Sequence, residues 1–373
     1  MKVNLYPKKA YLFNTFLVAF IIHAAQAGVG IAGLPRIVFL TAKHDAWISV
    51  FFAGVLTAGV IYIILFMLNQ YESADLYGIH YDIFGKYIGA LLSLIYVLYL
   101  LSACFIIVMN YVEIVQAWVF PDLQTWVLSL ILLLLGVYGV LGGIRVVVGI
   151  CFMSVILTIW LAFMLSAPLG HLDVTHLLPI WETKTLDIIK GISKTALSII
   201  GFELLLFVFP YIENKKRANF YAQMGNAYTT LLFTVVTLVS IGFFSEVSLT
   251  RTIWPVLSMF KIIQFPNLER FEFIAISFWM LIVLPNICIY LWAATKGIKR
   301  VFGKNQRRYI FIAASIIWGL CFFIRARYQM NMVTDWVGRI SYGTAFIYPV
   351  LLAAIVLVKK KLFKGGKKNE TSS

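Results

Sequence analysis

Apolar runs long enough to cross a membrane recur along this 373-residue chain and restrict what it can fold into. A transmembrane helix needs about 20 consecutive apolar residues. The chain is 61% hydrophobic and 13% charged, whereas soluble domains carry about 25% charged residues. We therefore predict an all-α integral membrane protein in which residues 1–373 form a single domain of ten transmembrane helices. The ten runs lie at 10–35, 46–69, 88–111, 126–142, 147–167, 191–212, 226–246, 271–295, 309–325 and 338–358.

The basic residues predict how these helices are oriented. With the N-terminus in the cytoplasm, the cytoplasmic segments hold twice as many lysines and arginines as the outer segments. Both termini are then cytoplasmic, including a basic tail at 359–373. This placement accounts for the net charge of +15 without nucleic acid, and the tail lysines suit anionic membrane lipid. The pattern Ala25, Gln26, Ala27 leaves cleavage of a signal peptide within the first run as an alternative.

The first run contains a cluster of glycines that a continuous helix would not favour. Gly28, Gly30 and Gly33 precede Pro35, and each interior glycine costs a helix about 1 kcal/mol relative to alanine. Within a bilayer, broken backbone persists only where it is buried in protein or lines a watery cavity. The cluster therefore predicts a discontinuous helix whose free backbone groups face a ligand. Close packing of helices through small residues is the alternative.

A polar outer segment at 168–190 divides the ten runs into five and five. The halves 10–167 and 191–358 would then form an inverted repeat, which places a substrate site near the midplane between paired broken helices. The sixth run fits, because it carries a glycine, a carboxylate and Pro210. We predict that the first and sixth helices are discontinuous. The ligand-binding residues would be Gly28, Val29, Gly30, Ile31 and Gly33 from the first helix, and Gly201, Phe202 and Glu203 from the sixth.

Glu203 is the most informative single residue. A carboxylate at the midplane costs roughly 3 kcal/mol on insertion scales, and such residues usually serve ion or substrate pathways. Glu203 is therefore a candidate proton carrier. The alternative is that backbone amides cap the carboxylate and that it closes the gap at Gly201.

Other polar side chains could border the same site. Tyr96 and Tyr99 share one face of the third helix and would line the pocket, or else pack as core aromatics. Glu269 and Glu272 open the eighth helix and would gate the outer mouth or pair locally. His23 and Asn286 could face the cavity. We expect no enzyme activity, no cofactor and no metal, because the sequence contains no P-loop and no H-E-x-x-H motif.

Four segments in order resemble the endospore germination permease family, the B subunit of nutrient germinant receptors within the amino acid–polyamine–organocation superfamily. They are 28–35, 83–89, 201–210 followed by Lys215, Lys216 and Arg217, and 268–272 with Trp279. The resemblance implies a leucine-transporter-like fold. It also implies the inner membrane of a dormant spore, a complex with an A subunit and a lipoprotein C subunit, and a small nutrient such as an amino acid as ligand.

The sequence leaves three functions open: a germinant sensor, a secondary transporter of amino acids, and a scaffold subunit that binds no ligand. Some proton-coupled permeases of the superfamily carry a lysine in the fifth helix, but the run 147–167 has no charged residue. Lysine-centred proton coupling is therefore disfavoured, and the sensor is the preferred interpretation.

Overall fold

A computed structural model describes residues 2–263, 270–303, 305–324 and 327–369. Over these ranges the regular structure is helical, and the only strand-like pairings are two isolated bridges, Asn4 with Ala74 and Phe13 with Ile212. The predicted all-α architecture is confirmed. Helices suit a bilayer because each one satisfies its backbone hydrogen bonds within itself.

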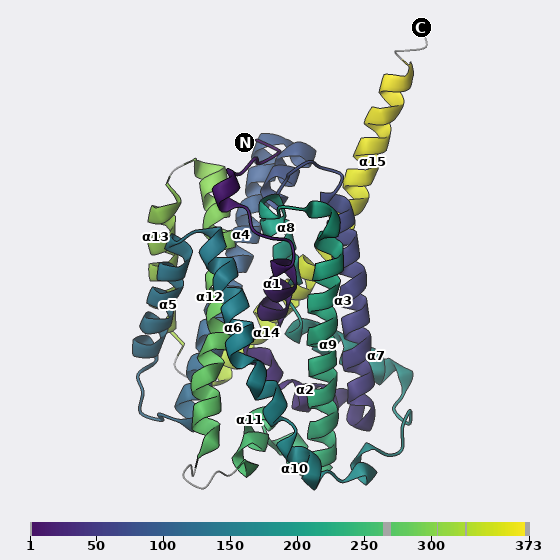
Figure 1. The fold of residues 1–373 in the computed structure, drawn as a ribbon, viewed down its shortest axis with the longest axis vertical. Helices are drawn as coiled ribbons and strands as arrows, with labels where there is room; N and C mark the ends of the chain where they lie inside the picture. The colour runs from purple at the N-terminus through teal and green to yellow at the C-terminus, as the bar shows by residue number, and fades with distance from the viewer. Residues whose placement is uncertain (1, 264–269, 304, 325–326, 370–373) are drawn as a thin grey trace.

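Long helices run side by side along the bundle, and several crossings are interrupted (Figure 1). The helices outside the interrupted pairs are α3 (Ala46–Leu68), α4 (Leu76–Trp118, with a break at Gly85), α5 (Thr125–Leu141), α6 (Ile144–Met164), α9 (Ala218–Phe243), α12 (Phe271–Phe302) and α13 (Gln306–Cys321). The interrupted pairs are α1 (Leu17–Gln26) with α2 (Leu34–Ala42), and α7 (Thr185–Ser198) with α8 (Leu205–Val208). A third pair, α14 (Arg327–Tyr342) and α15 (Tyr348–Asn369), is joined by a π-helical turn at Gly343–Ile347.

Within the described ranges, six helices are long and apolar enough to cross a membrane, or seven if the bent pair α7 and α8 is one crossing. Two further apolar helices, α1 and α5, are shorter than a full crossing. The expected ten crossings fit this bundle when each interrupted pair is taken as one crossing.

Both predicted breaks are present. Between α1 and α2 the backbone of Gly28 leaves the helical region, with φ −114° and ψ −147°, and a short 3-10 turn follows at Val29–Ala32. The sixth crossing bends by 51° at its break, where Gly201 adopts φ +130°. The two breaks touch, since a Cβ built at Gly201 would lie 2.4 Å from the carbonyl oxygen of Ala25. The first and sixth crossings are therefore discontinuous and meet at their breaks.

The two ends of the chain lie at the same end of the bundle (Figure 1). The N-terminal segment seals this end. Its Leu5 amide donates to the Ser73 carbonyl at 2.8 Å, and its Phe13 amide donates to the Tyr211 carbonyl at 3.0 Å. Nearby, the Arg300 guanidinium pairs with Asp75 at 2.8 Å. This end of the bundle is held closed by backbone and ionic contacts.

Three local features complete the architecture. Residues 76–84 form a short helix that a break at Gly85 separates from the rest of α4. After α9 the chain forms α10 (Glu246–Arg251) and α11 (Pro255–Met259), and α11 is largely buried. The tail also begins as helix, since α15 continues to Asn369. Lys359 anchors it through an ion pair with Asp82 at 3.0 Å.

Gly201→Ala should destabilise the protein by about 3 kcal/mol, because its positive φ disfavours a side chain and the new Cβ would strike the Ala25 carbonyl. Gly30→Ala is the matched control, since a Cβ there meets Ser198 only at an ordinary 3.5 Å. All four cysteines are buried. A thiol-reactive dye therefore reports unfolding during a thermal melt of the purified protein. Equal melting temperatures for the two variants would contradict the close approach of the breaks.

Candidate functional site

A cavity of ≈ 550 Å³ lies against the first break. Its walls come from the break itself, the second half of α4, the end of α7, the middle of α12, the link between α10 and α11, and α14. The α10–α11 end of the bundle is opposite the chain termini (Figure 1). The cavity thus reaches from the breaks toward the end that the N-terminal segment does not seal.

The predicted residues of the first break face two different pockets. Gly28, Val29, Gly30 and Gly33 line the cavity. A Cβ at Gly28 or Gly30 would make only ordinary contacts, at 3.7 and 3.5 Å, so close packing does not account for glycine at these two positions. Gly33 is tighter, with the Ile253 carbonyl oxygen at 3.2 Å from a built Cβ. Ile31 faces away from the cavity, into a smaller apolar pocket.

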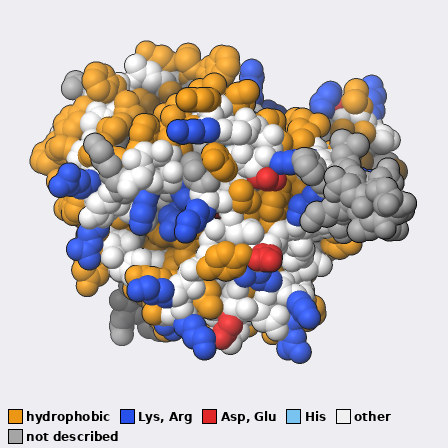
Figure 2. Space-filling view, turned by 90° about the horizontal axis from the view of Figure 1, so that it is seen from above, with side chains coloured by type: hydrophobic (Ala, Val, Ile, Leu, Met, Phe, Trp, Pro, Cys, Tyr) orange, Lys and Arg blue, Asp and Glu red, His pale blue; other side chains and the backbone are white. Residues whose placement is uncertain are grey.

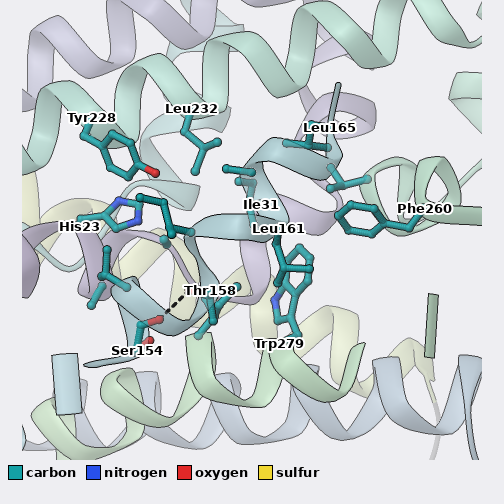
Figure 3. Close-up of a pocket in the computed structure, with 17 residues that line it drawn as sticks. His23, Ile31, Ser154, Thr158, Leu161, Leu165, Tyr228, Leu232, Phe260 and Trp279 are labelled. Atoms are coloured by element: carbon teal, nitrogen blue, oxygen red, sulfur yellow. Dashed lines mark hydrogen bonds between the residues drawn. The ribbon is translucent and has the colours of Figure 1, made fainter. Parts of the chain in front are cut away.

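That smaller pocket has a volume of ≈ 60 Å³ and lies behind the first break (Figure 3). It is lined by His23 of α1, Ile31 of the break and Trp279 of α12. Ser154 and Thr158 line it from α6. His23 therefore faces this pocket and not the larger cavity. Its Nδ1 lies 2.9 Å from the Thr229 hydroxyl, which itself donates to the Gly225 carbonyl.

The predicted residues of the sixth break, Gly201, Phe202 and Glu203, are buried and do not line the cavity, although the neighbouring Ile200 does. The Glu203 carboxylate accepts three hydrogen bonds: from the Tyr99 hydroxyl at 2.7 Å, the Tyr290 hydroxyl at 2.9 Å and the Gly201 amide at 2.8 Å. The geometry is that of the capped carboxylate, which closes the gap at Gly201. Phe202 packs edge-on against Phe346, with ring centroids 4.9 Å apart.

The two tyrosines of α4 also point into the protein rather than into the cavity. Tyr99 donates to Glu203, and the Tyr96 hydroxyl donates to the carbonyl of Thr344 at 3.1 Å. Their rings contact each other edge-on at 5.3 Å. Tyr290, on α12, does line the cavity and shares the Glu203 carboxylate with Tyr99. Tyr290 is therefore the link between the cavity and Glu203. Direct ligand contact by Tyr96 and Tyr99 stays a prediction without geometric support.

Of the two glutamates predicted to gate the outer mouth, the structure describes only Glu272, and Glu269 lies outside the described residues. Glu272 is buried and accepts a hydrogen bond from Arg270 at 3.2 Å, and it does not line the cavity. In the part of the chain that the structure describes, no group of three His, Cys, Asp or Glu side chains could hold a metal ion.

The cavity contains polar residues that the sequence analysis did not select. Gln26 is 1% exposed, and its Oε1 has no hydrogen-bond partner among the described atoms, while its Nε2 donates to Asn226 at 3.0 Å. Arg36 and Lys194 bring positive charge, and Glu113 and Asp335 bring negative charge. Of these residues, Lys194 could have been selected from the sequence, because it places a charge near the start of the apolar run 191–212. Asn286 lines the cavity as expected and donates to the Ala24 carbonyl at 2.8 Å.

These features define a class of protein: a multi-pass membrane protein with a transporter fold and a cavity at paired helix breaks. Two solved transporters share the fold, each with a TM-score of 0.63. A Na⁺-coupled sialic acid symporter is 12% identical, with 94% of this chain and 79% of the symporter covered. The transporter MhsT is 14% identical, with 92% and 87% covered. The expected leucine-transporter-like fold is confirmed.

The family is also established. Residues 13–330 match the spore permease family, described as spore germination protein. The chain is 36% identical over 352 residues to spore germination protein GerQB of Bacillus cereus, covering 94% of this chain and 98% of the relative. It is 25% identical to spore germination protein YndE of Bacillus subtilis (strain 168), covering 89% and 93%. The chain belongs to the spore germination permease family, and both family and fold are those of a non-enzymatic membrane protein.

Glu203→Gln should lower the free energy of unfolding by about 3 kcal/mol, because the amide cannot accept from all three donors and leaves a buried group unpaired. Glu246→Gln is the control. Glu246 pairs with Lys43 at 2.5 Å, but both side chains are 48% exposed, and such pairs contribute no more than about 1 kcal/mol. Thermal melts of both variants test this. Similar melting temperatures would contradict a structural role for the Glu203 carboxylate.

Proposed function

We propose that this protein is the nutrient-binding membrane subunit of a germinant receptor, and that it binds a small amino acid in the ≈ 550 Å³ cavity. The observation that carries the proposal is the meeting of exposed backbone at Gly28 and Gly30 with side chains of both charges in one cavity. Free backbone at a helix break binds charged groups of small solutes. A site for a zwitterion must present a positive group to its carboxylate and a negative group to its ammonium group.

The cavity offers separate partners for the two ends of an amino acid. Arg36 and Lys194 attract the carboxylate, and the start of α2 presents the positive end of its helix dipole nearby. Asp335 attracts the ammonium group, and the unpartnered Oε1 of Gln26 accepts one of its protons. An unpaired buried acceptor is costly, and a bound ammonium group removes that cost.

The contacts of Tyr290 suggest how binding becomes a signal. Its side chain lines the cavity, and its hydroxyl donates to Glu203, which also holds the amide of Gly201. A ligand that moves Tyr290 therefore changes the hydrogen bonding of the sixth break. The ligand changes this hydrogen bonding only if it binds the protein more tightly with Tyr290 in its moved position than in its present one.

The remaining parts of the receptor are also proposals. Assembly with A and C subunits in the spore inner membrane is supported by the relatives, which are named as spore germination proteins. Cytoplasmic termini are supported by the end of the bundle seen in Figure 2, where lysine and arginine side chains outnumber acidic ones. A basic face of this kind is typical of the cytoplasmic side of a membrane protein.

A secondary transporter is the second candidate, because the fold is shared with a Na⁺-coupled symporter. The two functions differ in flux. The test is to measure binding of a panel of labelled amino acids to the purified protein, and then uptake of any bound amino acid into proteoliposomes. Saturable binding without uptake supports the sensor, and uptake supports the transporter. Absence of saturable binding across the panel contradicts both and favours a scaffold.

Gly30→Leu should abolish binding, because the side chain would enter the cavity where Gly30 is now exposed. Gly59→Leu on α3 is the control, since nothing lies within 4 Å of a Cβ there and the residue is exposed outside the cavity. Binding and the germination response of spores carrying each variant provide the measurement. An unchanged nutrient response with Gly30→Leu would overturn the proposed site.

Lys194→Gln should weaken binding of an amino acid about tenfold, because a charge-assisted contact to the carboxylate is lost. Lys190→Gln, one turn earlier on α7, is the matched control. Lys190 pairs with Asp187 at 2.7 Å and does not line the cavity, so its loss should leave the affinity unchanged. Titration with an amino acid and with its carboxamide, which keeps the ammonium group but lacks the carboxylate, separates the carboxylate contact from general effects. Equal losses in the two variants would argue against Lys194.

A further inference from the structure

A second large cavity, of ≈ 630 Å³, lies at the end of the bundle that carries the chain termini. It is lined by Lys9 of the N-terminal segment, Leu17 of α1, and Arg145, Gly149 and Phe152 of α6. Glu213, which follows the sixth crossing, completes it. This cavity, here called the basic cavity, shares no lining residue with the ≈ 550 Å³ cavity, here called the nutrient cavity. The two cavities can therefore bind different molecules.

The mouth of this cavity carries two cations and one carboxylate. Lys9 and Arg145 are exposed, and neither is held in an ion pair with a described carboxylate. The guanidinium of Arg145 donates to the carbonyl of Ala10 at 3.4 Å, which holds it beside the N-terminal segment. Two adjacent cations favour a phosphate group, and the nearby Glu213 carboxylate accepts hydrogen bonds from hydroxyl groups.

Most of the remaining lining is apolar, and it includes Leu17 of α1 and Phe152 of α6, which lie at the contact between these helices, here called the α1–α6 seam. On α6 the seam consists of Gly149, Phe152, Val155 and Ile159, which recur every three or four residues and share one face. The rings of Phe20 on α1 and Phe152 on α6 meet at 4.8 Å. The smaller pocket of Figure 3 continues the seam, since Val155 and Ile159 line it too.

The length of the seam matches one leaflet of a bilayer. From Leu17, in the basic cavity, to Ala27, in the smaller pocket, α1 advances about 15 Å. The hydrocarbon core is about 30 Å thick, so one leaflet is about 15 Å deep. Ile159 is 39% exposed, so the pocket reaches the surface that faces lipid. A soluble phosphate would leave this apolar seam unused, whereas a phospholipid fills both parts.

We propose that the α1–α6 seam binds one anionic phospholipid of the phosphatidylglycerol class. Its phosphate contacts Lys9 and Arg145, and its head-group hydroxyls donate to Glu213. One acyl chain follows Gly149 and Phe152 toward the pocket behind the first break. Ala27 and Ile31, which line that pocket, flank the glycines of the nutrient cavity. The lipid therefore contacts the rear of the break that the proposed nutrient contacts from the front, yet its binding does not depend on nutrient recognition.

The test uses the purified full chain in nanodiscs that contain equal amounts of phosphatidylglycerol and phosphatidylcholine with identical acyl chains. Native mass spectrometry then counts the lipids that stay bound after release. The native protein should retain phosphatidylglycerol preferentially. The double variant Lys9→Gln, Arg145→Gln should lower that preference by roughly an order of magnitude. Lys216→Gln, an exposed cation at the same end but outside the cavity, should leave it unchanged.

A second pair of variants tests the apolar part. Nothing lies within 4 Å of a Cβ at Gly149 or at Gly59, so either position accepts a larger side chain without a clash. Gly149→Phe should displace the lipid by filling the seam, while Gly59→Phe should not. Equal retention of phosphatidylglycerol in all variants, or no preference in the native protein, would overturn the proposal. Displacement of the lipid by soluble glycerol 3-phosphate would show that a free phosphate suffices, and would equally overturn the lipid assignment.

Discussion

The carboxylate of Glu203 is the interaction on which the rest of this bundle depends. It joins α4 through Tyr99, α12 through Tyr290 and the sixth break through the amide of Gly201. A buried carboxylate without partners would cost several kcal/mol, so all three donors must be in place together. The same group therefore stabilises the break in the sixth crossing and couples it to a tyrosine that lines the cavity.

The glycines around the first crossing serve two different purposes. Gly201 and Gly225 let backbones approach, because a Cβ at either position would lie within 2.4 Å of a carbonyl oxygen on α1. Gly28 and Gly30 have room for a side chain, and what they provide is open space and free backbone beside the cavity. Helix α1 is thus packed closely on two sides, while the break that follows it is open to the cavity. This arrangement suits a fixed binding surface inside a bundle that can still respond to an occupant.

Much of the architecture could be predicted from local pattern. The apolar runs required helices. The glycine cluster at 28–33, and Gly201 with Glu203 and Pro210, predicted breaks in the first and sixth crossings, because hydrocarbon tolerates broken backbone only where protein or water satisfies it. Local pattern could not predict which of the candidate side chains face the cavity. Ile31 and Glu203 carry the right chemistry for a ligand, but one faces the rear pocket and the other is enclosed by two tyrosines. Which way a side chain points at a break depends on dihedral angles that a glycine leaves undetermined.

The sequence by itself determined that this protein spans a membrane, that its first and sixth crossings are interrupted, and that it resembles the germination permeases, since each of these depends on composition, spacing or ordered motifs. Only the tertiary structure decided that Gly28 and Gly30 line the cavity while Glu203 is enclosed and closes the second break. It also decided that Gln26, Arg36, Lys194 and Asp335 share one cavity. The physical reason is that these side chains lie on the first, sixth and tenth crossings, which are far apart in the chain and meet only when the bundle packs.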